Sequence, residues 1–278
     1  MAPKRMFTPS KNALHSRVAS SSPSTNYTPS HVRFCDEKAC MDFLENFSRR
    51  DIHFKCQVVL LDFSDTDIPT VIYNRSWESL CGILVTCPSM IIQEFYSNMH
   101  RFDYLVHHFI TCVRGTCIIV TSNLIFEVLH ILRVAHPDDL GCDHLKIVSK
   151  DKLSSLFCET PSSWDNHQNT PCSGFAKGPR FLNIVMTFVL HPLSHYNSIT
   201  EPRARFLLSL LEGLTIDFPF YFIVSLIEVY KDSATCDKLI FPSTIMRILR
   251  YASVSYPEST YFLVMCAIVA AIVQRSKA

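Results

Sequence analysis

The chain has 278 residues, 48% of them hydrophobic and 18% charged, a composition that supports one large domain or two small ones with a hydrophobic core. It has six glycines and neither a GxGxxG nor a GxxxxGK[ST] pattern, which argues against a nucleotide-binding loop. A formal net charge of +1 argues against a wholly basic nucleic-acid protein.

Residues 1–33 differ in composition from the rest of the chain. They hold five basic residues and no acidic one, a formal charge of +5, whereas the remainder has 21 bases and 25 acids, a formal charge of −4. The segment is rich in Ser, Thr and Pro and buries too little apolar surface to offset its chain entropy, so we expect a disordered leader. It is a solvated tail, a nuclear-import patch, an organelle transit peptide or a phosphorylated tail. Its bases are also the candidate phosphate contacts for nucleic acid: Lys4, Arg5, Lys11, Arg17 and Arg33.

Helical periodicity begins just after the leader. Ala39, Phe43, Leu44 and Phe47 predict an amphipathic helix that ends near residues 49–50. The short apolar run at 56–63 suits either a strand or a buried helical turn. Ser89 is expected to cap a further helix that carries the apolar side chains Ile91, Ile92, Phe95, Tyr96 and Met99.

A β-hairpin is predicted at about residues 109–120. Two runs that favour strands, 109–113 and 117–120, flank Arg114, Gly115 and Thr116, and Gly accepts the positive φ that a tight turn needs. A helix with an apolar face is then expected to start at Ser122.

The second half of the chain looks entirely helical. Residues 159–179 predict a loop that divides it from the first half. One helix follows the stripe Phe181, Leu182, Val185, Met186 and Val189. Further helices are predicted from an N-cap at Thr200 to a stop at Gly213, from Pro219 to Tyr230, and after Pro242.

The C-terminal segment, residues 255–278, contains an apolar run from Tyr261 to Val273. This run has 13 residues, whereas a membrane span needs roughly 20. We therefore expect a buried hydrophobic helix rather than a membrane-spanning one. A short membrane anchor is the alternative.

The twelve cysteines are expected to be reduced core thiols of an intracellular protein of the nucleus or cytoplasm. Most lie in apolar stretches, as Cys81, Cys117 and Cys266 do, and no CxxC pattern occurs. The nearest approach to a metal-ligand cluster is the group His107, His108, Cys112 and Cys117, but zinc sites use closely spaced pairs. We expect no metal and no cofactor.

The sequence gives little support for a catalytic site. A two-metal nuclease needs converging carboxylates, for which Asp62 would be the first and Asp138, Asp139 and Glu212 the partners. Each of these acids is also accounted for as a loop cap, a turn residue or a solvent-facing helix residue. The sequence moreover has no alternating series of strands and helices from which the sheet of such a nuclease could be built. His191 and His195 have the i, i+4 spacing of a chelating pair, but Pro192 between them favours a loop. Arg101, Arg114, Arg203 and Arg205 could extend a basic surface.

Five blocks of sequence resemble the putative plant transposon protein domain family in their order and spacing over residues 34–254. The family pattern of a helix reading EFY-x-N followed by a VRG hairpin is met by Glu94, Phe95, Tyr96, Asn98, Val113, Arg114 and Gly115. Trp77 in RSWESL is similar to a recurring turn. Three more blocks resemble the family: RFCDEKACMDFLENFSRRDI at residues 33–52, the segment with Thr200, Arg203 and Gly213, and the block with Phe241, Pro242 and Ile245. The resemblance implies an origin in plant retroelements and carries over no catalytic residues.

Together these observations predict a mainly α domain with one small β-hairpin behind a disordered leader. The expected role is that of a non-enzymatic structural or interaction module that associates with itself or with a protein partner of unknown identity. The alternatives are a nucleic-acid-binding module acting through the leader and, less favoured, a metal-dependent nuclease.

Overall fold

A computed structural model describes residues 33–53, 56–82, 87–103, 107–138, 148–160, 164, 169–190, 192, 197–232, 238–256 and 267–268. The rest of the expected leader, residues 1–32, lies outside them. The described residues are mainly helical, as predicted. No helix among them is long and apolar enough to cross a membrane.

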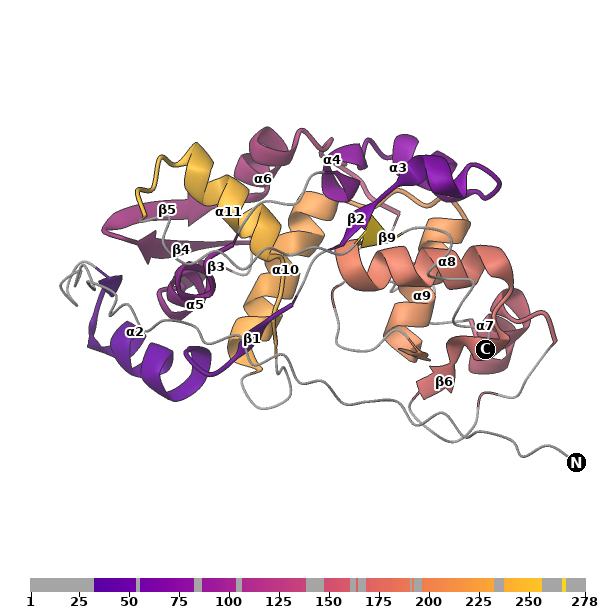
Figure 1. Ribbon diagram of the computed structural model, residues 1–278, viewed down its shortest axis with the longest axis horizontal. Coiled ribbons are helices and arrows are strands. Elements are labelled where there is room, and N and C mark those ends of the chain that lie inside the picture. The colour runs from indigo at the N-terminus through magenta and orange to yellow at the C-terminus, as the bar shows by residue number, and fades with distance from the viewer. Residues whose placement is uncertain are drawn as a thin grey trace, which may run out of the picture.

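Helices from the two parts of the chain lie side by side, since the late helix α11 packs beside α5 and α6 (Figure 1). Their bounds are α2 Glu37–Asp42, the π-helix η1 Phe43–Phe47, the 3-10 helix η2 Leu60–Phe63, α3 Ile68–Tyr73, α4 Glu78–Cys81, α5 Ser89–Ser97, α6 Ser122–Leu129, α7 Lys150–Phe157, the 3-10 helix η4 Cys172–Gly174, α8 Lys177–Val185, the π-helix η5 Met186–Leu190, α9 Glu201–Leu211, α10 Phe218–Lys231 and α11 Pro242–Tyr251.

The strands of the described residues form four small sheets, so the expectation of a single hairpin was too simple. An antiparallel sheet in the order β3-β4-β5 joins β3 His100–Asp103, β4 His108–Val113 and β5 Thr116–Val120. The others are two-stranded: β1 Asp51–Ile52 with β8 Lys238–Leu239, β2 Gln57–Val58 with β9 Ala267–Ile268, and β6 Asn169–Pro171 with β7 Ser198–Thr200.

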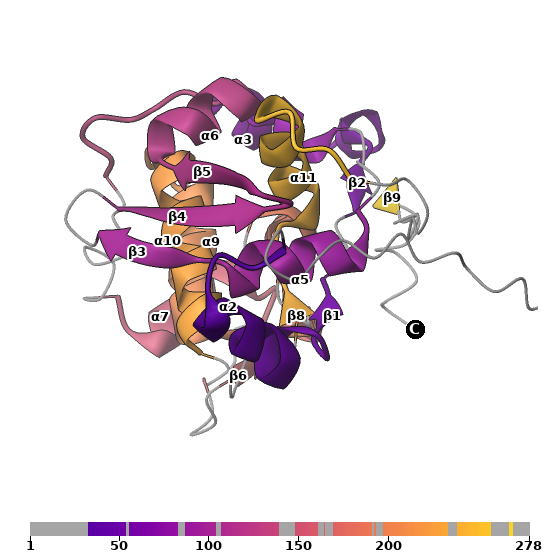
Figure 2. The same ribbon diagram turned by 90° about the vertical axis from the view of Figure 1, so that its left-hand side faces the viewer.

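The predicted hairpin is formed by β4 and β5. Val113 pairs with Thr116, which leaves a two-residue turn of Arg114 and Gly115 at φ 51° and 80°. Positive φ at both turn residues is the geometry whose twist matches that of the flanking strands. Figure 2 shows the sheet face-on with α10 behind it, and the rings of Phe102 and Tyr230, 5.0 Å apart, join the two.

The first predicted helix is α-helical over a shorter stretch than its periodicity implied, because only α2 is a regular α-helix and η1 is a π-helix. Asp36 caps α2 by accepting from the backbone N–H of Ala39 at 2.7 Å. The chain then widens into η1, and the change in periodicity leaves Leu44 exposed while Ala39 and Phe47 are buried. The run at 56–63 contains both of the elements that were considered, the strand β2 followed by the turn η2.

Helix starts in the second half agree closely with their sequence signals. Thr200 occupies the N-cap of α9 with Pro202 in its first turn, and Gly213 after its end has φ 75°. Helices α10 and α11 begin at Phe218 and Pro242. In the first half, α6 begins at Ser122 as predicted, with Thr121 as its N-cap, whereas Ser89 is the first residue of α5 and Pro88 holds the N-cap position.

Three expectations for the second half need correction. It is not entirely helical, since β6, β7, β8 and β9 lie within it. The described part of the segment 159–179 is not a bare loop, because β6 pairs with β7 and η4 precedes α8. Ala267 and Ile268 are extended and pair in parallel with Gln57 and Val58, so the expected C-terminal helix is wrong there. The reason is that a short apolar run rich in Val and Ile is compatible with both a buried strand and a buried helix, so periodicity alone does not distinguish them.

One hydrophobic core runs through the described chain from Phe47 to Val254. At its centre the ring of Phe218 lies 5.5 Å from Trp77, 6.5 Å from Phe222 and 6.3 Å from Phe241. Trp77 precedes α4 in the first half of the sequence, whereas Phe218, Phe222 and Phe241 belong to the second. The core therefore draws on both sides of residues 159–179.

Arg75 ties the first half to the end of α9. Its guanidinium donates to the carbonyl oxygens of Ser209, Leu210 and Leu214 at 3.5, 3.4 and 2.9 Å. It also lies over the Trp77 ring at 5.5 Å, and burial lowers its pKa from the ordinary value. A cation at this position complements the negative end of the helix, and it gives the Ser209 and Leu210 carbonyls a second donor beside the backbone N–H groups of Leu214 and Gly213.

Replacing this side chain tests the contact. We expect Arg75→Ala to lower the free energy of unfolding by about 1.5–3 kcal/mol, the range for hydrogen bonds made by a charged group. Arg49→Ala is the control because Arg49 is exposed. Urea unfolding followed by circular dichroism measures both, and equal midpoints for the two variants would contradict the role given to Arg75.

Candidate functional site

A buried carboxylate lies where α5 meets the β4–β5 turn. Glu94 is in the middle of α5, on a face that also carries Ile91 and Phe95, and it is 0% exposed. Ile91, Ile92, Phe95, Tyr96 and Met99 are buried as predicted, so α5 lies with most of its surface inside the molecule. An acidic side chain at this depth needs partners for both of its oxygens.

Two arginines from distant segments provide those partners. The backbone N–H of Arg114, in the hairpin turn, donates to Glu94 Oε1 at 2.8 Å. Arg114 Nε lies 3.2 Å from Glu94 Oε2, and Arg33 Nε donates to the same oxygen at 3.4 Å. The Arg33 guanidinium also sits over the rings of Phe34 and Phe43, 5.0 Å from each centroid.

Burial and ion pairing act on Glu94 in opposite directions. Desolvation raises the pKa of its carboxyl, while the Arg114 N–H and the two guanidinium groups lower it. Burial has the larger effect, so the pKa of Glu94 remains above its ordinary value.

Asn98 and Tyr96 of the sequence motif, together with Thr111 in β4, hold the same helix in place. Asn98 accepts from the backbone N–H of Cys35 and donates to the carbonyl of Arg33, both at 2.8 Å. The Tyr96 hydroxyl donates to the carbonyl of Ile240 at 3.1 Å. Thr111 in β4 donates to the carbonyl of Phe95 at 2.7 Å.

These contacts define a chemical role for the cluster around Glu94, Arg33, Asn98 and Arg114. Each Glu94 oxygen is occupied and the carboxyl has no exposed surface, so it cannot reach a substrate. The arrangement instead joins the segment 33–35, α5 and the hairpin. Sequence reasoning did not single out Glu94 as a contact, although one acid on an apolar helix face is a signal of a buried pair.

The proposed catalytic carboxylates occupy surface positions. Asp62 is exposed in η2, and Glu212 is exposed just after α9. Asp138 accepts from the backbone N–H and the hydroxyl of Thr215 at 3.0 and 2.8 Å. Asp139 lies outside the described residues. Among the residues that the structure describes, no group of three or more His, Cys, Asp or Glu could hold a metal ion.

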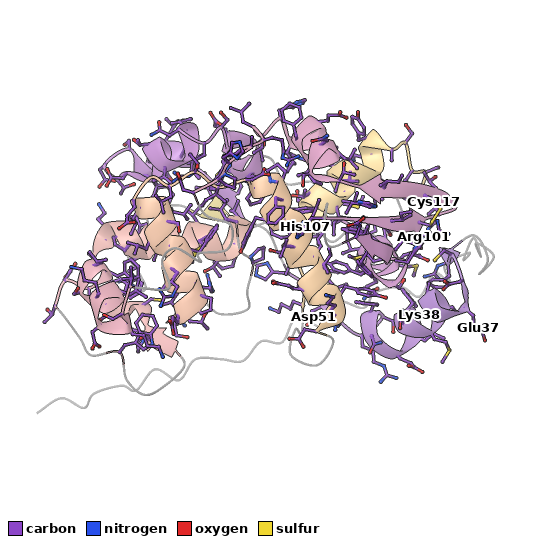
Figure 3. The ribbon with its side chains drawn as sticks, turned by 180° about the vertical axis from the view of Figure 1, so that it is seen from behind. Glu37, Lys38, Asp51, Arg101, His107 and Cys117 are labelled. Atoms are coloured by element: carbon purple, nitrogen blue, oxygen red, sulfur yellow. A yellow bond between two sulfur atoms is a disulfide. The ribbon has the colours of Figure 1, made fainter. Side chains whose placement is uncertain are left out.

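The candidate His and Cys ligands are dispersed. His107 packs on the Phe220 ring with centroids 4.4 Å apart, and Figure 3 places it far from Cys117. Cys117 is bonded to Cys112 in a disulfide, which corrects the expectation that Cys117 is a reduced core thiol. Its side chain lies on the outer face of the sheet, where the alternation of β5 puts it. His191 and His195 fall outside the described residues.

The arginines proposed for a basic surface are mostly internal. Arg203 and Arg205 are only 3% and 7% exposed. Arg203 donates to the Thr187 hydroxyl at 2.5 Å, and burial lowers its pKa to about 10. Arg33 and Arg114 contact Glu94, whereas Arg101 is exposed. Lys4, Arg5, Lys11 and Arg17 lie outside the described residues.

A small hollow beside α11 is lined by a buried histidine. Its lining includes His53, Phe188, Pro192, Phe241 and Thr244, and its free space is about 10 Å³. A space of this size has room for about one water molecule. The hollow is therefore far too small for a cofactor.

The fold and the polar cluster define a mainly helical domain in which a buried carboxylate fastens a VRG hairpin to a central helix. Residues 73–255 match the model of the family described as the putative plant retrotransposon-related domain. The chain belongs to this family, in agreement with the resemblance seen in the sequence. The matched residues include Trp77, Glu94 and Arg114, whereas the block at residues 33–52 precedes them. No curated protein and no solved structure matches the chain.

Proposed function

We propose that this retroelement-derived chain acts as a non-enzymatic structural or interaction module. The observation that carries the proposal is that the residues that resemble the family pattern are buried and make contacts within the chain. Glu94 and Asn98 are 0% exposed and Trp77 is 1% exposed, and each contacts other parts of the same chain. Residues that bind or transform a substrate must instead be reachable from solvent.

The surface, rather than the motif, then carries the interaction. The wide apolar stripes of α8 to α11 are largely buried in the core and are not free for a partner. Large apolar side chains are exposed elsewhere, among them Met41, Leu44 and Ile119, which are 46%, 55% and 57% exposed. These exposed side chains support a role in docking, either to a second copy of the chain or to another protein.

The proposal is tested on the full-length protein by two measurements. We expect no cleavage of DNA or RNA in the presence of Mg²⁺ or Mn²⁺, and a molar mass by light scattering that rises with concentration in the micromolar range. Cleavage that is lost in Asp62→Ala would contradict the non-enzymatic role. A strictly monomeric mass would count against self-association and leave a protein partner as the form to test.

A further inference from the structure

We propose that Cys112 and Cys117 form a reversible disulfide that an external dithiol opens at Cys117, and that this bond controls how firmly the hairpin turn holds Glu94. The proposal concerns a modification site and does not depend on the function proposed above.

The two cysteines are positioned by the strand pairing. Cys112 and Cys117 are direct partners in the β4–β5 ladder, with Cα atoms 4.0 Å apart. The pairs on either side, Thr111 with Ile118 and Val113 with Thr116, keep the strands aligned when the sulfur–sulfur bond is broken. The two thiols therefore stay opposite each other, and the bond can form again as an intramolecular step.

The bond encloses a very short loop. Its cysteines are five positions apart in the sequence. The constraint that a disulfide places on the unfolded chain grows with the length of the loop it closes, so this bond contributes less to global stability than a bond between distant segments. Opening it is thus compatible with a folded domain.

Accessibility differs between the two sulfurs. Cys117 is exposed at the outer end of the sheet (Figure 3), whereas Cys112 is 7% exposed. A thiolate of the dithiol attacks Cys117 Sγ, forms a mixed disulfide and expels Cys112 as a thiolate, which takes up a proton. The second thiolate of the reductant then attacks its own sulfur in the mixed disulfide and releases Cys117. The dithiol loses two electrons and two protons, and the two cysteines gain them.

The bridged turn is the element that contacts Glu94. Arg114 lies between the two cysteines and supplies both a backbone N–H at 2.8 Å and a guanidinium nitrogen at 3.2 Å to this buried carboxylate. Without the bond, the turn opens more often, and each opening removes two of the contacts of Glu94. The redox state of the exposed Cys117 sulfur thus affects the buried ion pair of Glu94, because both are attached to the same two-residue turn.

The bond itself is tested by alkylation of the native full-length chain. The protein is equilibrated with buffers of reduced and oxidised dithiothreitol, quenched in acid, alkylated with N-ethylmaleimide and digested with trypsin. Cleavage after Arg114 separates the two cysteines, so a linked pair of peptides reports the disulfide and two alkylated peptides report the dithiol. We expect one reversible two-electron transition in the absence of denaturant.

Two exposed-cysteine variants sharpen this test. Cys117→Ser should abolish the linked peptides, whereas Cys35→Ser, at an exposed thiol outside the hairpin, should leave the transition unchanged. The proposal is overturned if both peptides are alkylated in oxidised dithiothreitol, or if the bond is reduced only after the protein is unfolded.

Hydrogen exchange tests the link to Glu94. We expect reduction to lower the protection of the Arg114 amide about 10- to 30-fold, the low end of what loss of a disulfide produces, while amides in α10 change little. Equal protection of Arg114 in the two redox states would overturn the coupling even if the bond proved reversible.

Discussion

Glu94→Ala is expected to lower the free energy of unfolding by about 3–5 kcal/mol, the usual cost of removing one partner of a buried ion pair. The substitution leaves the Arg114 N–H without its acceptor and removes the counter-charge of Arg114 and Arg33, whose side chains are only 12% and 21% exposed. It also empties the space that a fully buried side chain had filled. Urea unfolding, with an unchanged dependence on urea concentration, measures the loss.

Glu45→Ala provides the matched control. Glu45 is an exposed helical glutamate, so its replacement should change the free energy of unfolding by no more than about 0.5 kcal/mol. If Glu94→Ala cost as little as Glu45→Ala, the cluster would not hold α5 to the hairpin.

The same carboxyl predicts a pH dependence. Because burial raises the pKa of Glu94 in the folded state, the folded protein binds this proton more tightly than the unfolded chain does. The contribution of Glu94 to stability is therefore greatest below its ordinary pKa and falls as the pH rises through the raised value. The free energy of unfolding of the native protein, minus that of Glu94→Gln, should decrease across this window. An increase would mean that the two arginines outweigh desolvation.

Features with a local cause could be predicted from the sequence. The hairpin follows from Arg114 and Gly115 between two strand-forming runs, and three helix starts follow from Pro202, Pro219 and Pro242 in the first turn. Each signal lies within a few residues of the element that it specifies. The local physics of the turn or cap is then sufficient to place the element.

Features made by distant segments could not be predicted in this way. The strands β1 and β8 are two residues long, and Asp51 meets Lys238 across most of the chain. Such a pair leaves no periodicity in the sequence. Glu94 likewise acquires its role from Arg33 and Arg114, which α5 alone does not reveal. The disulfide had a visible cause, since Cys112 and Cys117 are symmetric about a two-residue turn, but the three-residue turn considered from the sequence hides this symmetry.

Phe218→Ala is expected to lower the free energy of unfolding by about 3–5 kcal/mol, as large-to-small substitutions of buried aromatic residues do. Phe218 is 0% exposed and its ring lies between those of Trp77, Phe222 and Phe241. Phe220→Ala, two residues away in α10, removes a ring that is partly exposed and contacts His107, so it should cost about 1 kcal/mol.

The Phe218→Ala variant also tests whether the chain unfolds as one unit. Trp77 contributes to this cluster from the first half of the sequence and the other rings contribute from the second, so a cavity at Phe218 weakens both halves together. In a Trp164→Phe background, where fluorescence reports Trp77 alone, this signal and the circular dichroism of the helices should therefore shift to the same lower urea midpoint. Separate midpoints for the two signals would show that residues 159–179 divide two independently stable parts, and that the shared aromatic cluster is an interface between them rather than a common core.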